Sequence, residues 1–465
     1  MLDAIHWDTD LLRRYAQTGP RYVSYPSVEH FHSGIGSFEL LHALRESRKA
    51  RRPLSLYVHL PFCANSCYHC SRNRLVSKDR GRTSSYLQHL EKEIELLSCH
   101  LDPKQRVEQL HVGGGTPTFL NHGELRRLLA TLRQHFNLRS DDAGDYGIEI
   151  DPRETDWSTM GLLRELGFNR ASIGLQDLDP QVQQAINRLQ SLEQTRTIVE
   201  AARTLQFRSI TIDLSYGLPR QTPEGFARTL DAVLALQPDR LSLFNYAHQP
   251  ARFQAQRRIN PDELPSAQAK LTMLHNSITQ LQNAGYRYLG MEHFALADDE
   301  LASAQEDGTL QRNYRSYSTH GHYDLLGLGV SAISQIGDLY SQNSSDLAAY
   351  QQSLANGQLS TCRGLLCNAD DRLRRSVIQQ LICTFGVEFA DLEKQFNIDF
   401  AEYFSALWPQ LRQMAADGLL DLSANGLRMR PAGRLLTRAV CRLFDHYLPV
   451  QPPQQEVLDV QKNPD

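Results

Sequence analysis

The sequence predicts an α/β protein built on a parallel β-sheet, followed by a smaller, mainly helical domain. Between residues 54 and 245, short apolar strand patterns alternate six times with stretches of helical apolar spacing. After about residue 365 the alternation stops. Successive strand–helix units imply parallel strands joined by right-handed crossovers. Six units are fewer than the eight of a closed barrel, and a doubly wound sheet shows the same pattern. Periodicity therefore leaves both alternatives open.

The strand segments of these units are short and either apolar throughout or alternating in polarity. The six predicted strands are Leu54–His59, Val107–Val112, Tyr146–Ile150, Asn169–Leu175, Ser209–Leu214 and Arg240–Asn245. The helices predicted between them include Ser84–Ser98, Gly123–His135, Ser191–Leu205 and Pro223–Leu236. Their apolar residues share one face, so each helix can cover the sheet.

The two ends of the chain depart from this alternation. Residues 1–50 form an N-terminal extension, in which the prolines of Gly19–Pro26 favour an ordered extended segment over a helix. We expect the core region to cover residues 51–365 and a C-terminal domain to cover residues 366–447. The tail, residues 448–465, has four prolines among mostly polar residues and is predicted to be disordered.

The C-terminal domain combines helices with a hairpin. Apolar spacing predicts helices at Arg372–Cys383 and Asp391–Phe396. The segment Gly418–Arg430 predicts a hairpin that turns at Asn425-Gly426, with a further helix after it. This arrangement is similar to a winged-helix domain.

Composition and charge exclude several function classes. The chain has 465 residues, of which 41% are hydrophobic and 22% charged, and its formal net charge is −4. This balance argues against a nucleic-acid-binding protein that works through its overall field. No run of 18 apolar residues predicts a transmembrane helix, and the N-terminus lacks a signal-peptide pattern. We therefore expect a cytoplasmic protein with reduced thiols.

Three of the eight cysteines crowd into one loop directly after the first predicted strand, at Cys63, Cys67 and Cys70. Three thiolates can hold one side of a metal centre. A structural zinc site needs a fourth ligand, which His59 or His69 could supply. A four-iron cubane on three thiolates instead leaves one iron open for a substrate or cofactor. The C-x3-C-x2-C spacing favours the cubane over the zinc site.

Polar residues or glycines also follow the other predicted strands. They are the run Gly113–Pro117, then Glu149, Gln176, Asp177 and Asp213, and finally Asn245–His248. Active sites of parallel α/β folds lie beyond the carboxyl ends of the strands. A glycine run allows backbone to approach a ligand closely. Carboxylates and amides suit a ligand that carries cationic groups and hydroxyls. We therefore expect these residues to form one active site with the cysteine loop.

The cysteine spacing at the end of the first strand resembles that of the radical S-adenosylmethionine (SAM) enzymes. Across nearly the whole chain, the sequence is similar to the oxygen-independent coproporphyrinogen III oxidases of that superfamily. The similar segments are Gly19–Pro26, Tyr57–Cys63, Gly113–Thr118, Ile148–Glu154, Asp213–Pro219, Phe244–His248 and Asp324–Ser334. The resemblance implies a partial (β/α)6 barrel and an N-terminal extension over the active site. It also implies a family-specific extension within residues 51–365.

The resemblance also implies cofactors and their ligands. Cys63, Cys67 and Cys70 would hold a [4Fe-4S] cluster, and SAM would chelate its open iron. Enzymes of this family bind two SAM molecules. The first would contact Tyr57, Gly114, Glu149 and Ile333. The second would contact Gly115, Thr116, Gln176, Arg188, Asp213, Ala247 and, at the position of a family aromatic, His69.

The reaction implied is the anaerobic oxidative decarboxylation of two propionates of coproporphyrinogen III to vinyl groups. It gives protoporphyrinogen IX and uses a 5′-deoxyadenosyl radical derived from SAM. The resemblance further implies a monomer that receives electrons from a donor such as a flavodoxin or ferredoxin. Four propionates call for basic or phenolic partners. Candidates for these partners are Arg21, Tyr22, Arg312 and Tyr314.

The chain departs from the family pattern directly after the third cysteine. The family loop continues with a glycine and a fourth cysteine, whereas this chain has Ser71 and Arg72. Arg72 would place a permanent positive charge beside the cluster and near the second SAM. One alternative function is a related protein that binds heme or porphyrin without decarboxylating it. Another is a zinc-containing, SAM-dependent methyltransferase.

Overall fold

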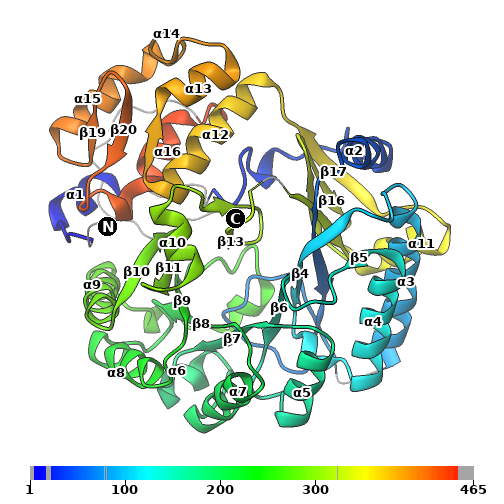
Figure 1. Ribbon diagram of the computed structural model, residues 1–465. Helices are drawn as coiled ribbons and strands as arrows, with labels where there is room; N and C mark the ends of the chain where they lie inside the picture. The colour runs from blue at the N-terminus through cyan, green and yellow to red at the C-terminus, as the bar shows by residue number, and fades with distance from the viewer. Residues whose placement is uncertain (1–4, 17–21, 78, 80, 322, 449–465) are drawn as a thin grey trace. The chain divides into compact units, whose positions relative to one another are not determined.

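The predicted parallel sheet is present in the structure, a computed structural model that describes residues 5–16, 22–77, 79, 81–321 and 323–448 (Figure 1). The chain forms two compact units. The sheet unit consists of residues 31–264 and 322–366, and the terminal unit consists of residues 1–30, 265–321 and 367–465. The predicted disordered tail lies outside the described residues from residue 449 onward, as does Arg21.

Six parallel strands form the centre of the sheet unit. They are β1 (Leu54–Leu60), β4 (Arg106–Gly114), β6 (Asp145–Ile150), β7 (Arg170–Gln176), β8 (Ser209–Tyr216) and β9 (Arg240–Asn245). Each strand pairs in parallel with the next along the chain. A doubly wound sheet reverses its strand order, whereas this order runs in one direction, as in a barrel. The predicted partial (β/α)6 barrel is therefore confirmed.

Four further strands extend the sheet on the other side of β1. Strand β14 (Asp324–Leu328) pairs with β1 in parallel. It is followed by the antiparallel strands β15 (Ile333–Ile336), β16 (Leu339–Asn343) and β17 (Thr361–Leu366). The sequence patterns did not predict these strands. Shorter strands of the unit are β2 (Phe62–Cys63), β3 (Leu75–Val76) and β5 (Asn137–Leu138).

The helices of the sheet unit begin at residues that cap their free N–H groups. Asn121 and Ser191 each form a capping box at the start of a helix, and Thr222 caps a helix whose first residue is Pro223. The main helices are α2 (Ser37–Ala50), α3 (Gly81–Ser98), α4 (His122–His135), α5 (Trp157–Glu165), α6 (Pro180–Ala185), α7 (Leu192–Thr204), α8 (Pro223–Leu234) and α11 (Leu347–Ala355). Short 3-10 helices are η2 (Pro117–Phe119), η3 (Gln254–Arg258) and η4 (Pro261–Glu263).

The terminal unit is mainly helical and has its own apolar core. Its helices are α1 (Thr9–Tyr15), η1 (Val28–His30), α9 (Ala267–Asn283), α10 (Glu300–Glu306), α12 (Ala369–Thr384), α13 (Phe389–Phe396), α14 (Phe400–Tyr403), η5 (Ser405–Leu407), α15 (Trp408–Ala416), η6 (Arg434–Leu436) and α16 (Thr437–Phe444). Stacked rings such as Phe389 and Phe400, whose centroids lie 4.0 Å apart, fill its core.

The strands of the terminal unit are short. They are β10 (Tyr286–Gly290), β11 (His293–Leu296), β12 (Gln311–Arg312), β13 (Tyr317–Ser318), β18 (Gly386–Glu388), β19 (Leu420–Leu422) and β20 (Gly426–Met429). The predicted hairpin is present as β19 and β20, and β18 adds a third strand to it. The unit includes residues 265–321, which the sequence analysis placed in the core region. The domain boundaries expected at residues 50, 365 and 447 stay predictions.

No helix within the described ranges is long and apolar enough to cross a bilayer.

A buried carboxylate, Glu93 on α3, fixes one side of the sheet unit. Its oxygens accept hydrogen bonds from the Tyr350 hydroxyl at 2.7 Å, the Gly329 N–H at 2.7 Å and the Asn343 amide at 2.5 Å. Burial raises the pKa of Glu93 to about 7, although these hydrogen bonds act in the opposite direction.

The Glu93 carboxyl should make the stability of the fold depend on pH. The unfolded chain releases the Glu93 proton near pH 4.5, whereas the folded chain keeps it up to about pH 7. The free energy of unfolding should therefore fall by about 3 kcal/mol as the pH rises through this window. Urea titrations of Glu93→Gln should show a flatter pH profile than the parent. The matched control Glu95→Gln, on the exposed side of α3, should keep the parent profile; equal slopes in the parent and Glu93→Gln would contradict the assignment.

Candidate active site

A pocket lies at the carboxyl ends of the parallel strands, within the sheet unit. Loops after β1, β4, β6 and β7 and a side chain of β8 line it, where parallel α/β folds place their active sites. Of the residues predicted from the sequence, the pocket is lined by Cys63, Cys67, His69, Cys70, Gly114, Gly115, Thr116, Glu149, Gln176, Arg188 and Asp213. The structure thus brings together eleven of the fourteen predicted site residues.

Three predicted residues are not among those that line this pocket. Tyr57 is buried in β1, and its hydroxyl lies 3.0 Å from Nδ1 of His59. Ile333 is buried at the start of β15, and Ala247 follows β9. Asp177, also noted from the sequence, is buried in a network with Thr229 and Gln221, which is a structural role.

The cysteine loop begins in β2 and is closed by the short parallel pair of β2 and β3. The Leu75 N–H donates to the Pro61 carbonyl at 2.6 Å, and the Ser77 N–H donates to the Cys63 carbonyl at 3.1 Å. These bonds hold the two ends of the loop together. All three loop cysteines are free thiols.

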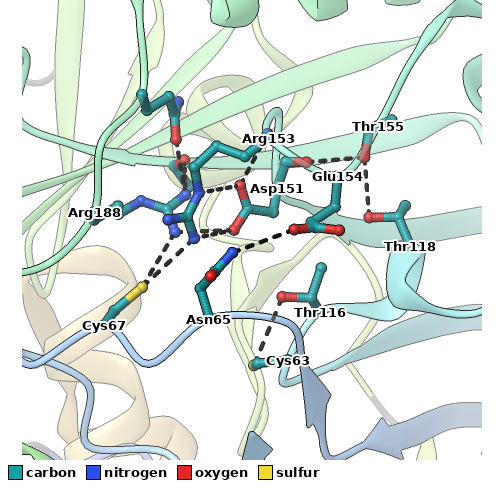
Figure 2. A network of polar contacts seen from close by, with 12 residues as sticks. Cys63, Asn65, Cys67, Thr116, Thr118, Asp151, Arg153, Glu154, Thr155 and Arg188 are labelled. Atoms are coloured by element: carbon teal, nitrogen blue, oxygen red, sulfur yellow. Dashed lines mark hydrogen bonds and ion pairs between the residues drawn. The ribbon is translucent and has the colours of Figure 1, made fainter. Parts of the chain in front are cut away.

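Each of the three sulfur atoms has a hydrogen-bond donor close to it. The Thr116 hydroxyl donates to Cys63 Sγ at 3.7 Å, and the Arg72 N–H donates to Cys70 Sγ at 3.5 Å. Cys67 Sγ receives two guanidinium groups, from Arg153 at 3.5 Å and from Arg188 at 3.7 Å (Figure 2). Donors and positive charge at sulfur stabilise thiolates, the form that binds iron.

Asp151 holds the two arginines beside Cys67. Its carboxylate accepts hydrogen bonds from Arg153 at 2.6 Å and from Arg188 at 3.0 Å, and Figure 2 shows the two guanidinium groups between this carboxylate and the sulfur. Burial alone would raise the pKa of Asp151, but Arg153 and Arg188 together lower it to about 2. Asp151 is therefore ionised at neutral pH. Sequence reasoning did not single out Asp151 and Arg153, although both lie in the segment Ile148–Glu154.

The geometry does not support a zinc site with His59 as the fourth ligand. Burial raises the pKa of Cys63 to about 11 despite the Thr116 hydrogen bond and the charge of Arg74, so an apo thiol is protonated there. His59 has both ring nitrogens occupied, by the Tyr57 hydroxyl and by the Asn73 carbonyl at 3.0 Å. In the part of the chain that the structure describes, no three histidine, cysteine or acidic residues converge on a single metal ion. A cubane is larger, and its thiolates stand further apart.

His69 follows Cys67 by two residues and lines the pocket. Burial, followed by the charges of Arg188 and Arg74, lowers its pKa to about 3, so the ring is neutral. Its Nδ1 is buried and has no hydrogen-bond partner within the described residues. A ligand in the pocket could satisfy this nitrogen.

The glycine run after β4 packs against the cysteine loop. The Gly115 N–H donates to the Leu60 carbonyl at 2.8 Å, and a Cβ at Gly115 would lie 2.4 Å from the Phe62 carbonyl oxygen. Gly114 has a φ of +113°, which favours glycine. Close backbone packing therefore explains much of this run, in addition to the ligand approach expected from the sequence.

The acidic and amide groups lie on the neighbouring strands. Glu149 on β6 accepts a hydrogen bond from the Gly114 N–H at 3.2 Å, and its other oxygen lies 3.5 Å from His111 Nε2. Asp213 on β8 accepts from the Ser172 hydroxyl at 3.2 Å, and burial raises its pKa. Gln176 ends β7 with a φ of +76°, a strained value for this residue type, and accepts from the Ser215 hydroxyl at 2.5 Å.

Arg188 and Arg72, both expected at or near the second SAM, contact groups of the protein itself. Arg188 donates to Asp151, to the Gly174 carbonyl at 2.5 Å and to Gln190 at 3.0 Å, so three protein groups already accept its hydrogen bonds. Arg72 donates to the Glu149 carboxylate and to the Gly114 carbonyl. Glu149 and Gly114 belong to the first predicted SAM site, whereas the sequence analysis placed Arg72 near the second.

The residues considered for propionate binding belong to the terminal unit, as far as they are described. The Tyr22 hydroxyl donates to Asp445 at 3.1 Å, and the Arg312 guanidinium lies 4.6 Å from the centre of the Tyr317 ring. Arg312 is buried, and its Nε and Nη1 have no partner among the described residues.

The fold and the three-cysteine loop define a radical SAM enzyme. The Radical SAM superfamily model matches residues 57–233, and the HemN C-terminal domain model matches residues 367–436. The oxygen-independent coproporphyrinogen III oxidase of Pseudomonas aeruginosa is 67% identical over 449 residues, which cover 97% of this chain and 98% of the relative. The enzyme of the same name from Escherichia coli K12 is 46% identical, with 96% of each chain covered.

The comparison of structures agrees with the comparison of sequences. The solved structure of E. coli coproporphyrinogen III oxidase, a radical SAM enzyme, matches with a TM-score of 0.92 at 44% identity. It covers 96% of this chain and 100% of the solved chain. The chain belongs to the oxygen-independent coproporphyrinogen III oxidase family.

Proposed function

We propose that the chain catalyses the anaerobic oxidative decarboxylation of two propionates of coproporphyrinogen III, giving the vinyl groups of protoporphyrinogen IX. The observation that carries this proposal is one pocket in which three free thiols meet the polar ends of the parallel strands. The P. aeruginosa relative, 67% identical over 97% of this chain, supports the choice of substrate.

The residues of the pocket have distinct proposed roles. Cys63, Cys67 and Cys70 hold the [4Fe-4S] cluster, and Arg153 and Arg188 balance the negative charge of its thiolates. When bound, the cluster and SAM supply the 5′-deoxyadenosyl radical that removes a hydrogen atom from the propionate. The buried floor of strands excludes water from this chemistry.

We assign two SAM sites, formed by residues that line this pocket together with Tyr57, Ile333 and Ala247, which are not among its lining residues. Glu149 and the Gly114 backbone bind the amine of the first SAM, since a carboxylate and a carbonyl are suitable acceptors for a cation. Tyr57 and Ile333 support this site from β1 and β15. The residues of the second site are Gly115, Thr116, Gln176, Arg188, Asp213, Ala247 and His69.

The enzyme works in the cytoplasm as a monomer in heme biosynthesis. A flavodoxin or ferredoxin supplies its electrons, because cleavage of SAM requires a reduced cluster.

Anaerobic turnover tests the proposed function. Reconstituted and reduced protein is mixed with SAM and coproporphyrinogen III, and the products are oxidised and separated by porphyrin chromatography. We expect protoporphyrin and the intermediate with one vinyl group. Unchanged coproporphyrin together with tight porphyrin or heme binding would support the alternative of a related binding protein and would overturn the proposal.

Variants of the second site should lose activity without losing the cluster. Asp213→Ala and Gln176→Ala each remove a polar partner of the proposed second SAM, and turnover should fall about tenfold or more. Iron content should stay close to that of the parent, because neither side chain contacts a cysteine sulfur in the hydrogen bonds described. The exposed surface variant Glu193→Ala serves as the control. Iron loss as complete as in a cysteine variant would reassign either residue to a structural role.

A further inference from the structure

Arg72 connects three segments at the edge of the pocket. It belongs to the cysteine loop, and its guanidinium donates to the Gly114 carbonyl at 3.4 Å, where β4 ends. The same group forms an ion pair with Glu149 on β6. The Arg72 side chain is 49% exposed and that of Glu149 only 14%, so the guanidinium lies on the solvent side of the carboxylate.

Both oxygens of Glu149 are engaged in this arrangement. Oε2 accepts from Arg72 and from the Gly114 N–H at 3.2 Å, and Oε1 lies 3.5 Å from His111 Nε2. A Cβ at Gly113 would lie 2.7 Å from Oε1, so backbone covers that oxygen as well. An incoming ammonium group therefore finds the carboxylate already neutralised and covered.

The negative groups around Arg72 favour this position. Glu149 contributes most to raising the pKa of Arg72, and Tyr57, Cys70 and Asp213 act in the same direction. A guanidinium is charged at every relevant pH, so Arg72 competes with any cationic ligand for Glu149.

We infer that Arg72 is an internal competitor of the cationic amine of SAM for the Glu149 carboxylate, and thereby weakens SAM binding at the first site. This inference rests on the proposed function, because it requires that Glu149 receive the SAM amine. Arg72 is thus a residue that sets affinity and specificity. Arg72, which stands where the family has a fourth cysteine, therefore acts at the first SAM site.

Equilibrium dialysis of the reconstituted, oxidised holoprotein measures this competition without turnover. The variants are Arg72→Gln, Arg72→Lys, Glu149→Gln and the double variant Arg72→Gln/Glu149→Gln. The probes are SAM and 5′-methylthioadenosine, which lacks both the amine and the carboxylate. Iron content and circular dichroism check that each variant is folded and loaded.

Arg72→Gln should bind SAM about fivefold more tightly than the parent. SAM then no longer has to break the Arg72–Glu149 ion pair, and a partly exposed pair contributes about this factor to an equilibrium constant. Arg72→Lys keeps the charge and should stay near the parent. In the Glu149→Gln background the Arg72→Gln change should give no gain, and the affinity for 5′-methylthioadenosine should not change in Arg72→Gln. Arg126→Gln removes an arginine of similar exposure, which pairs with the exposed Glu165; it is the control and should leave SAM affinity unchanged.

Each of four results would overturn the inference. Weaker SAM binding in Arg72→Gln would show that Arg72 holds the SAM carboxylate instead. A gain that persists in the Glu149→Gln background, or that extends to 5′-methylthioadenosine, would show that the pair does not act through the amine. If the parent and every variant load the cluster but none binds SAM, the proposed function itself fails, and the inference fails with it.

Discussion

Cys67→Ala should assemble no stable cluster and show no SAM cleavage. Three thiolates are the minimum protein support of a cubane, and Cys67 is the thiol that two guanidinium groups stabilise. Iron and sulfide analysis with an anaerobic visible spectrum measures the loss. Cys63→Ala and Cys70→Ala should behave in the same way.

The scattered thiols provide matched controls for this result. Cys99 and Cys362 are exposed free cysteines outside the loop. Their alanine variants should retain the iron content and the spectrum of the parent. A parent-like cluster spectrum in Cys67→Ala would disprove the ligand assignment.

Asp151→Ala should destabilise the fold by about 3–5 kcal/mol, the cost of leaving buried charge without its partner. The change leaves the Arg153 and Arg188 guanidinium groups without the carboxylate that joins them, and both side chains are largely buried. Urea unfolding of the cluster-free protein at neutral pH measures the loss. Cluster loading should also fall, since the two arginines position their donors beside Cys67.

Asp141→Ala is the control for this variant, because Asp141 pairs with Arg139 at 2.6 Å and is 60% exposed. Solvent screens such a pair, so unfolding should change little. Equal unfolding midpoints of Asp151→Ala and the parent would contradict a role of Asp151 in holding the two arginines.

Much of the fold could be predicted from the sequence because the central strands are strongly apolar. Strand β1 is buried along its whole length, and its predicted bounds differ from the observed ones by one residue. Strands β15, β16 and β17 were missed because antiparallel pairing joins segments whose own patterns are short and mixed. The three-residue strand β18 has no pattern that could be detected alone.

Local sequence patterns predicted most residues of the site, but not the contacts between residues far apart in the sequence. The cysteine spacing and the polar strand ends are local patterns, and eleven of the fourteen residues predicted from them and from the family resemblance line one pocket. The contacts of Asp151 with Arg188, and of Arg72 with Glu149, join residues 37 and 77 positions apart. Such pairs depend on how the strands align, and no local spacing in the sequence predicts them.

Electron paramagnetic resonance of the reduced holoprotein, recorded before and after addition of SAM, tests most directly whether the pocket holds a cluster with one open iron. We expect the signal of a reduced [4Fe-4S] cluster, a clear change of its g-values when SAM binds, and no signal in Cys67→Ala. A cluster signal that SAM leaves unchanged, or one zinc ion per chain in place of iron and sulfide, would contradict the assignment.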